Sequence, residues 1–217
     1  MRTEDLIDRL ARDAGPVRPL ASPPWRVLGW LAVALGFAAA MVWAIGPRPD
    51  LAERLTEARF LIEQGAALAT AVAAALAALA LTLPDASRAW RFLPVIPGAA
   101  WLATLGIGCA RDWAQMGPDG LRLTPDPECF VYIVIIGSLP LLVLVLMLRR
   151  GVPLRPSWTL GLAALAAAAI GNFALRLFHM QDAALMVLVW QVGAVALIAA
   201  LAALCGRSIL RWPGLPA

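Results

Sequence analysis

The side chains of this 217-residue sequence that are best suited to chemistry are two thiols, an imidazole and a thioether. Cys109 ends one uncharged apolar run, Cys129 begins another, and His179 and Met180 lie in a short connection between two further runs. Thiolate, imidazole and thioether are soft ligands that suit Zn²⁺ or Cu⁺. Their spacing matches no zinc motif such as paired CxxC or HxxxH. These four residues are therefore candidates for sensing a signal, and Cys129 and His179 are candidates for a metal site of unknown identity.

The pair Cys109 and Cys129 allows several outcomes. A disulfide between them is possible if both thiols face an oxidising compartment. Two free buried thiols are the simpler outcome. The third cysteine, Cys205, lies at the far end of the last apolar run and is expected to serve packing.

A second group of polar residues lies within and beside the last two apolar runs. Asn172, Arg176 and His179 are spaced by four and three residues, which places them on one face of a helix. Gln191 in the following run is positioned to meet them. Polar residues inside a membrane are costly and usually face the interior of a bundle. The group is either an interhelical hydrogen-bond clamp, or a sensing site or solute path.

Six uncharged apolar stretches must position these residues. The chain is 61% hydrophobic with a mean hydropathy of +0.78, and about 20 helical residues cross the hydrocarbon core of a bilayer. The sequence therefore predicts an all-α polytopic membrane bundle of six transmembrane helices. The second and fifth stretches are rich in Ala, which permits close approach of helices, so we expect them inside the bundle. The expected spans are 27–45, 64–84, 92–110, 129–148, 157–178 and 183–206.

The arginine distribution predicts the orientation. All 18 basic residues are Arg, and the net charge is +4. The side with both termini (1–26 and 207–217) and the loops 84–91 and 149–156 holds 12 Arg and 5 acidic residues. The other side holds 6 Arg and 9 acidic residues. Because basic loops stay in the cytoplasm, we expect both termini to be cytoplasmic.

The N-terminal segment 1–26 contains a short amphipathic helix. Thr3 is a good helix cap, and Gly15 with Pro16 would end the helix. Leu6, Ile7 and Leu10 fall on one face, and a helix of about 11 residues is marginal alone. Its apolar face therefore needs a partner. The candidates are the membrane surface, the loops of the bundle itself, or a cytoplasmic protein that binds the helix in a groove.

The sequence gives no sign of an enzyme. It lacks a P-loop, GxSxG, HExxH and a pair of carboxylates within the apolar runs. No cofactor is expected.

The pI of 9.7 comes from Arg at the ends of apolar runs. This distribution is typical of membrane loops and not of direct nucleic-acid binding. The bilayer itself is the expected environment.

Several short motifs resemble the NrsF family of bacterial anti-sigma-F factors. The first is the stretch from Thr3 to Leu10 followed by Pro16-Val17, and the second is Arg48-Pro-Asp-Leu51 after the first span. The most specific part runs through 129–153, with Gly-Ser-Leu-Pro inside the span and Leu-Arg-Arg-Gly-Val-Pro after it. The resemblance covers nearly the whole chain.

The resemblance implies a six-helix protein of the bacterial inner membrane that sequesters an extracytoplasmic-function sigma factor. The docking element would be the N-terminal segment, here Leu6, Ile7 and Leu10. Members of the family are expected to respond to envelope, heavy-metal or oxidant stress through two cysteines on the outer side. Cys129 occupies the first of these positions, whereas Met180 stands at the second. Three alternatives follow: Cys109 substitutes for the missing thiol, His179 and Met180 supply a different soft-metal site, or this chain no longer senses that signal.

The rival prediction is a small solute transporter or channel. In that case Asn172, Arg176, His179 and Gln191 would line a polar path along the fifth and sixth helices. The sequence shows no pair of interrupted helices of the kind that transporters use.

Overall fold

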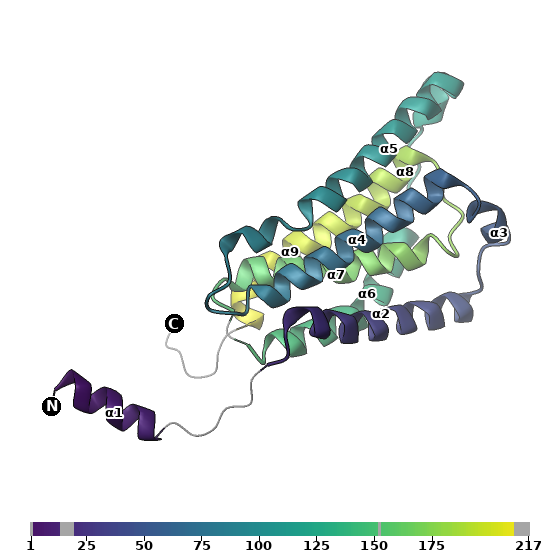
Figure 1. Cartoon of the computed structure of the whole chain (residues 1–217). Coiled ribbons are helices and arrows are strands. Elements are labelled where there is room, and N and C mark those ends of the chain that lie inside the picture. The colour runs from purple at the N-terminus through teal and green to yellow at the C-terminus, as the bar shows by residue number, and fades with distance from the viewer. Residues whose placement is uncertain (1, 14–19, 152, 211–217) are drawn as a thin grey trace.

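The computed structural model describes residues 2–13, 20–151 and 153–210, and all regular secondary structure in these ranges is helical (Figure 1). The predicted all-α fold with six helices of membrane-spanning length is confirmed. The short N-terminal helix α1 (Thr3–Asp13) precedes them. The six long helical segments are α2 (Pro23–Ile45), α4 (Ala58–Ala80), α5 (Val95–Met116), α6 (Pro127–Leu148), α7 (Pro156–Leu175) and the continuous segment α8 (Ala184–Met186), η3 (Val187–Val192) and α9 (Gly193–Ile209).

The long helices alternate in direction along the chain. α2, α5 and α7 therefore end where α4, α6 and α8 begin, and we call this the distal end of the bundle. The short helix α3 (Leu51–Arg54) and the single turn η2 (Gly117–Leu121) lie there, on the right of Figure 1. The opposite, proximal end carries η1 (Arg88–Phe92) and the first residues of α2.

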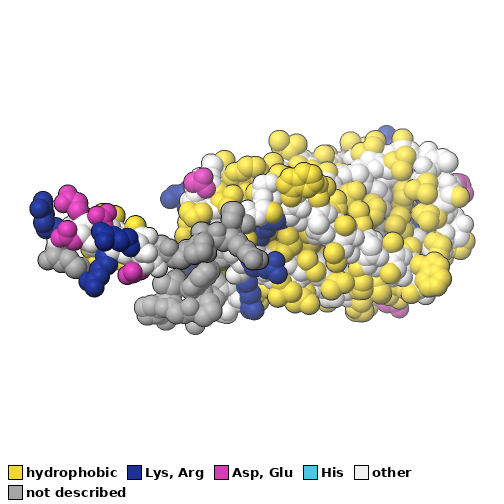
Figure 2. All heavy atoms as spheres, turned by 60° about the horizontal axis from the view of Figure 1, so that its bottom comes forward, with side chains coloured by type: hydrophobic (Ala, Val, Ile, Leu, Met, Phe, Trp, Pro, Cys, Tyr) yellow, Lys and Arg dark blue, Asp and Glu magenta, His cyan; other side chains and the backbone are white. Residues whose placement is uncertain are grey.

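Helix α7 is the centre of the bundle, as its Ala content predicts. It packs against α2, α4, α6 and α9. In its most apolar 18-residue stretch, 78% of the residues are buried inside the protein. The same share is 50% for the second Ala-rich helix, α4, and 17–33% for α2, α5, α6 and the last segment. Small side chains let the backbones approach, so the most Ala-rich helices pack inside. The surface of the bundle is also mainly apolar, with charged side chains near its ends (Figure 2).

Several helix ends differ from the expected spans. α4 begins at Ala58, six residues before 64, because the charged side chains of its first turns pair with each other and with α7. α5 continues to Met116 instead of 110. α2 begins at Pro23, a favourable residue for the first helical turn, and ends at Gly46, whose φ of 97° suits glycine.

The fifth span is shorter than expected, and this corrects the placement of His179. α7 ends at Leu175, and the next residues form tight turns in which Leu177 N–H bonds Ala174 O at 3.0 Å and His179 N–H bonds Leu175 O at 2.8 Å. His179 therefore leaves the helical face that Asn172 and Arg176 would share with it. Residues 14–19 and most of the expected tail 207–217, namely 211–217, lie outside the described residues.

Candidate functional site

The apolar face predicted for α1 is present and uncovered. Leu6, Ile7 and Leu10 are 41%, 58% and 63% exposed, and no residue of the helix is buried. Glu4 and Asp5 lie in the first turn, where negative charge suits the helix dipole. The prediction that the loops of the bundle itself cover this face finds no support among the described residues.

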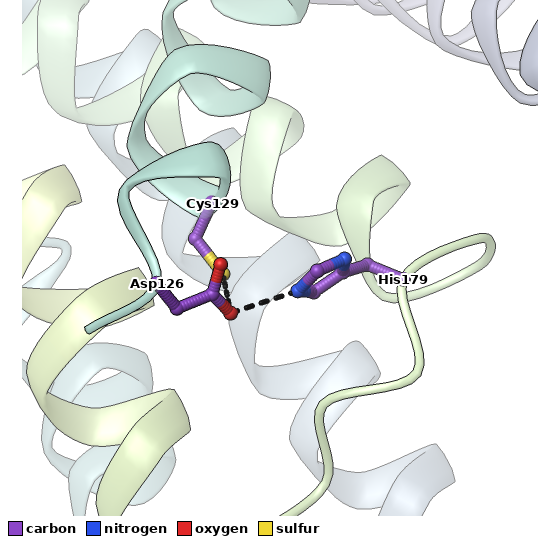
Figure 3. A group of neighbouring side chains, drawn as sticks. All are labelled: Asp126, Cys129 and His179. Atoms are coloured by element: carbon purple, nitrogen blue, oxygen red, sulfur yellow. Dashed lines mark hydrogen bonds and ion pairs between the residues drawn. The ribbon is translucent and has the colours of Figure 1, made fainter. Parts of the chain in front are cut away.

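At the distal end, one carboxylate joins a thiol and an imidazole from two different parts of the chain (Figure 3). Asp126 precedes the first residue of α6, and its Oδ2 atom accepts a hydrogen bond from Cys129 Sγ at 3.0 Å. The same oxygen lies 2.9 Å from Nε2 of His179, which follows α7. The Cys129 side chain is fully buried, whereas Asp126 and His179 are partly open to the surface.

The order of these three groups limits their chemistry. A nucleophilic cysteine needs the imidazole in contact with its thiol, but here the carboxylate stands between the two. Burial raises the pKa of Asp126, yet the hydrogen bonds from Cys129 and His179 outweigh it and hold the pKa below its ordinary value. An ionised carboxylate, a thiol and an imidazole whose ligand atoms lie within 4.8 Å of one another are suited to holding a cation.

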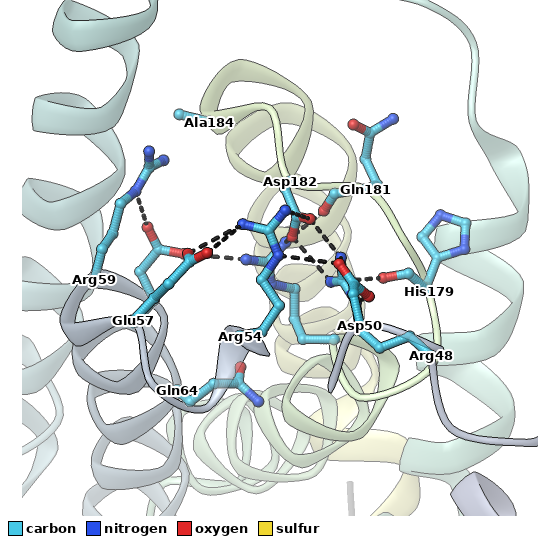
Figure 4. Close-up of polar contacts among 12 residues, drawn as sticks. Arg48, Asp50, Arg54, Glu57, Arg59, Gln64, His179, Gln181, Asp182 and Ala184 are labelled. Carbon is cyan, nitrogen blue, oxygen red and sulfur yellow. Dashed lines mark hydrogen bonds and ion pairs between the residues drawn. The ribbon is translucent and has the colours of Figure 1, made fainter. Parts of the chain in front are cut away.

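A dense group of ion pairs lies beside this trio at the distal end (Figure 4). Arg48, which follows α2, binds Asp50 with Nε–Oδ1 at 2.7 Å and Asp182 with Nη1–Oδ1 at 3.0 Å. Arg54 of α3 pairs with the same two carboxylates, at 3.2 Å each. The Arg48 side chain is only 1% exposed, so the two carboxylates compensate a buried charge.

The network continues into the bundle through α4 and α7. Arg176 lies 3.3 Å from Glu63 and 3.0 Å from Asp182 and also donates to the carbonyl of Gln181. Glu63 is paired in turn with Arg59 at 2.8 Å. The side chains of Arg176 and Glu63 are 5% and 4% exposed. The ion pairs of Arg176 therefore compensate buried charges and hold α4 against the end of α7.

The backbone of His179 is tied to this network. Arg48 N–H donates to Leu177 O at 3.0 Å, and Arg48 Nη1 donates to His179 O at 3.4 Å. Arg48, which follows α2, therefore fixes the backbone of the connection from α7 to α8. This connection places the imidazole of His179 beside α6.

The other residues singled out in the sequence do not join one polar cluster. The three cysteines are free thiols in the structure: Cys129 is buried, Cys109 of α5 is intermediate and Cys205 is exposed. Met180 is 66% exposed. Oδ1 of Asn172 and both amide atoms of Gln191 have no hydrogen-bond partner among the described residues, so no bond joins the two amides.

The sequence assigned no role in the distal site to Asp126, Glu63, Asp182 or Arg48. A signal was present for Asp126, because it stands three residues before Cys129 at the start of a helix. Glu63 and Arg48 also have local partners, Arg59 and Asp50. Their other partners, Arg176 and Asp182, are more than a hundred residues away, and nothing in the local sequence indicates those.

The chain is similar to known proteins along nearly its whole length. The profile of the NrsF family, described as negative regulator of sigma F, matches residues 10–212. The chain is 30% identical to the anti-sigma-F factor NrsF of Caulobacter vibrioides (strain NA1000 / CB15N), over 98% of this chain and 100% of that protein. No solved structure matches the chain.

Proposed function

This chain belongs to the NrsF family of negative regulators of sigma F, and we propose that it is an inner-membrane anti-sigma factor that captures an extracytoplasmic-function sigma factor through Leu6, Ile7 and Leu10 of α1. A stress signal from the envelope, metal or redox in nature, then releases the sigma factor. The family is one of regulators, which agrees with the lack of enzyme motifs in the sequence.

The uncovered apolar face of α1 supports the docking role. A helix of 11 residues is marginal in water without a partner, and its Leu6, Ile7 and Leu10 side chains remain exposed. A groove on a protein partner takes such a helix by its apolar residues. The polar face of α1 carries both acidic and basic residues, whereas helices that lie on membranes favour a basic polar face.

The contact between α2 and α6 provides a route from the distal end to α1. The Arg26 guanidinium donates to the carbonyl of Met147 at 2.6 Å, and Trp30 Nε1 donates to the carbonyl of Pro140 at 3.0 Å. α6 begins with the Asp126–Cys129 pair, and α2 is the first helix after α1 in the chain. A change of packing at the start of α6 would therefore act on the helix that carries the docking segment. Such coupling requires two discrete packings of the bundle.

We place both termini in the cytoplasm on the basis of the arginine distribution, with the distal end facing outward. A reporter of cytoplasmic location fused ahead of Thr3 should be active, and the same reporter inserted in the loop 117–126 should be inactive. The reverse pattern would contradict the docking proposal.

The transporter alternative has no specific observation in its favour. Arg176 is held by Glu63 and Asp182. Two cavities of about 280 and 340 Å³ lie along α9 and are lined almost entirely by apolar side chains such as Leu162, Leu165 and Val195. A polar solute would find few partners in them.

The docking proposal is tested by co-purifying the full chain in detergent with a co-expressed extracytoplasmic-function sigma factor. The double variant Leu6→Asp/Leu10→Asp should lose capture. The control Arg9→Gln/Arg12→Gln changes the net charge of α1 by the same two units on its polar face and should keep capture. Equal capture by the two double variants, or loss only in the control, would refute docking through the apolar face.

A further inference from the structure

The trio Asp126, Cys129 and His179 has the composition of a site for a divalent cation. One thiolate, one imidazole nitrogen and one carboxylate oxygen are the donors that Zn²⁺ takes in proteins. A thiolate disfavours Mg²⁺ and Ca²⁺, which prefer oxygen ligands. With a neutral imidazole, the thiolate and the carboxylate carry two negative charges, which a divalent ion balances and Cu⁺ does not.

The distances fit such an ion. Bonds of 2.0–2.3 Å to a tetrahedral ion place the ligand atoms about 3.5 Å apart. The carboxylate oxygen now lies 3.0 Å from Cys129 Sγ and 2.9 Å from His179 Nε2, and all three ligand atoms lie within 4.8 Å of one another. To admit the ion, the carboxylate oxygen must move about 0.5 Å away from each neighbour. The distance between Cys129 Sγ and His179 Nε2, which is at most 4.8 Å, must become about 3.5 Å.

A buried amide beside the trio supplies a second, independent observation. Gln191 is 0% exposed, and neither its Oε1 nor its Nε2 atom has a hydrogen-bond partner among the described residues. Its side chain lies next to Cys129, where η3 packs against α6. An orphaned buried amide is costly. The π-helical turn that carries Gln191 is a feature often found at functional sites.

From these observations we propose that Asp126, Cys129 and His179 bind one ion of the Zn²⁺ class at the distal end, with Gln191 beside the fourth coordination position. The ion replaces the thiol proton: Cys–SH and M²⁺ give the metal thiolate and one released H⁺. The carboxylate, which now accepts hydrogen bonds from both neighbours, becomes a ligand. The side chains of His179 and Asp126 are 22% and 15% exposed, so the ion can reach them from the surface.

Binding would add a metal bridge between two parts of the fold that now meet through the Asp126 carboxylate and through the rings of Tyr132 and Phe178. Asp126 and Cys129 belong to the start of α6, and His179 belongs to the connection between α7 and α8, whose backbone Arg48 holds. The ion would therefore fix the position of the start of α6 relative to that connection. This proposal concerns ion binding by the chain itself and is independent of the sigma-factor partner.

The test uses the purified full chain in detergent with Cys109→Ser and Cys205→Ser, so that Cys129 is the only thiol. Co²⁺ added to this protein should give the absorption of a Co²⁺–thiolate bond with one ion per chain, and Zn²⁺ should displace it. Cys129→Ser should remove the band, and Asp126→Asn and His179→Gln should each weaken binding more than tenfold. Absence of the band in the parent protein, or equal affinity in the three variants, would overturn the proposal.

A second measurement avoids the variants that could fail to fold. In membranes that hold the same double-serine protein, Zn²⁺ should slow alkylation of Cys129, and a chelator should restore the rate. Mg²⁺ at the same concentration should leave the rate unchanged. Identical alkylation with and without Zn²⁺ would count against the site.

Discussion

Trp30 of α2 donates its indole N–H to the carbonyl oxygen of Pro140 in α6, at 3.0 Å. Trp30 is 1% exposed and Pro140 is buried, so the bond lies inside the bundle. It joins the helix that follows the N-terminal segment to the helix that begins with Asp126 and Cys129. Because the bond is directional, it fixes the rotation of α2 against α6 as well as their separation.

We predict that Trp30→Phe lowers the free energy of unfolding by about 0.5–1.5 kcal/mol, because an aromatic ring is kept while one hydrogen bond is lost. The matched control is Trp43→Phe, since Trp43 lies on the same helix and is 85% exposed. Unfolding of both variants is followed by titrating detergent micelles with dodecyl sulfate. Equal unfolding midpoints for the two variants would show that the indole bond does not contribute to stability.

Close approach of α7 to α6 gives a second prediction. A Cβ atom at Gly171 would lie 2.6 Å from the carbonyl oxygen of Ile133, so Gly171→Ala must push the two helices apart. Overpacking of this kind costs about 1–3 kcal/mol. Gly36→Ala is the control, because a Cβ at Gly36 meets nothing within 4 Å. We expect a lower unfolding midpoint in dodecyl sulfate for Gly171→Ala only. A midpoint of Gly171→Ala equal to that of the parent protein would contradict the close packing of α7 and α6.

The helices were predictable because membrane insertion imposes a simple rule of length and hydropathy on the sequence. The Ala-rich stretches also identified α4 and α7 as interior helices, since small side chains have little to gain from lipid and much from close packing. The start of α4 was not predictable from the same rule. Counting uncharged residues excluded Arg59 and Glu63, whose charges are compensated by residues that the rule does not consider.

The candidate site was predictable only in part. Cys129 and His179 stood out because soft ligands are scarce in this chain. Their link, Asp126, could not be assigned, because it depends on the turn that ends α7 at Leu175 and swings His179 toward α6. Helical spacing alone placed His179 with Asn172 instead. Tertiary contacts, and not local pattern, determine which polar groups meet.

The ion pair between Arg176 and Glu63 gives a third prediction. Both side chains are at most 5% exposed, and removing Arg176 leaves the buried Glu63 with Arg59 as its remaining cationic partner among the described residues. We expect Arg176→Met to lower the free energy of unfolding by about 2 kcal/mol, because a hydrogen bond between buried charged groups is lost while part of the charge compensation remains. The control Arg122→Gln breaks an exposed pair with Asp119, whose side chains are 76% and 71% exposed, and should cost at most about 1 kcal/mol. Similar losses in the two variants, measured by the same detergent titration, would refute the buried pair.

The carboxylates around Arg48 make stability depend on pH in the acid range. The hydrogen bond from Arg48 lowers the pKa of Asp50 from 3.8 to about 2. Burial raises the pKa of Asp182, but the hydrogen bond from Arg48 and the charge of Arg176 outweigh it, so this pKa is lowered as well. A carboxyl group whose pKa is lower in the folded state stabilises the fold above its unfolded pKa, and this contribution is lost as the pH falls through the folded pKa.

The unfolding midpoint should therefore be flat above about pH 4 and fall between about pH 4 and pH 2. Asp50→Asn should lower the midpoint at pH 7 and make the fall in acid shallower, because one of the titrating groups is gone. Asp85→Asn, at an exposed position in the loop at the opposite end, should leave the profile unchanged. The midpoint is measured by tryptophan fluorescence in a nonionic detergent. If Asp50→Asn has the same acid profile as the parent protein, the pairing of Asp50 with Arg48 does not contribute to the stability of the folded chain.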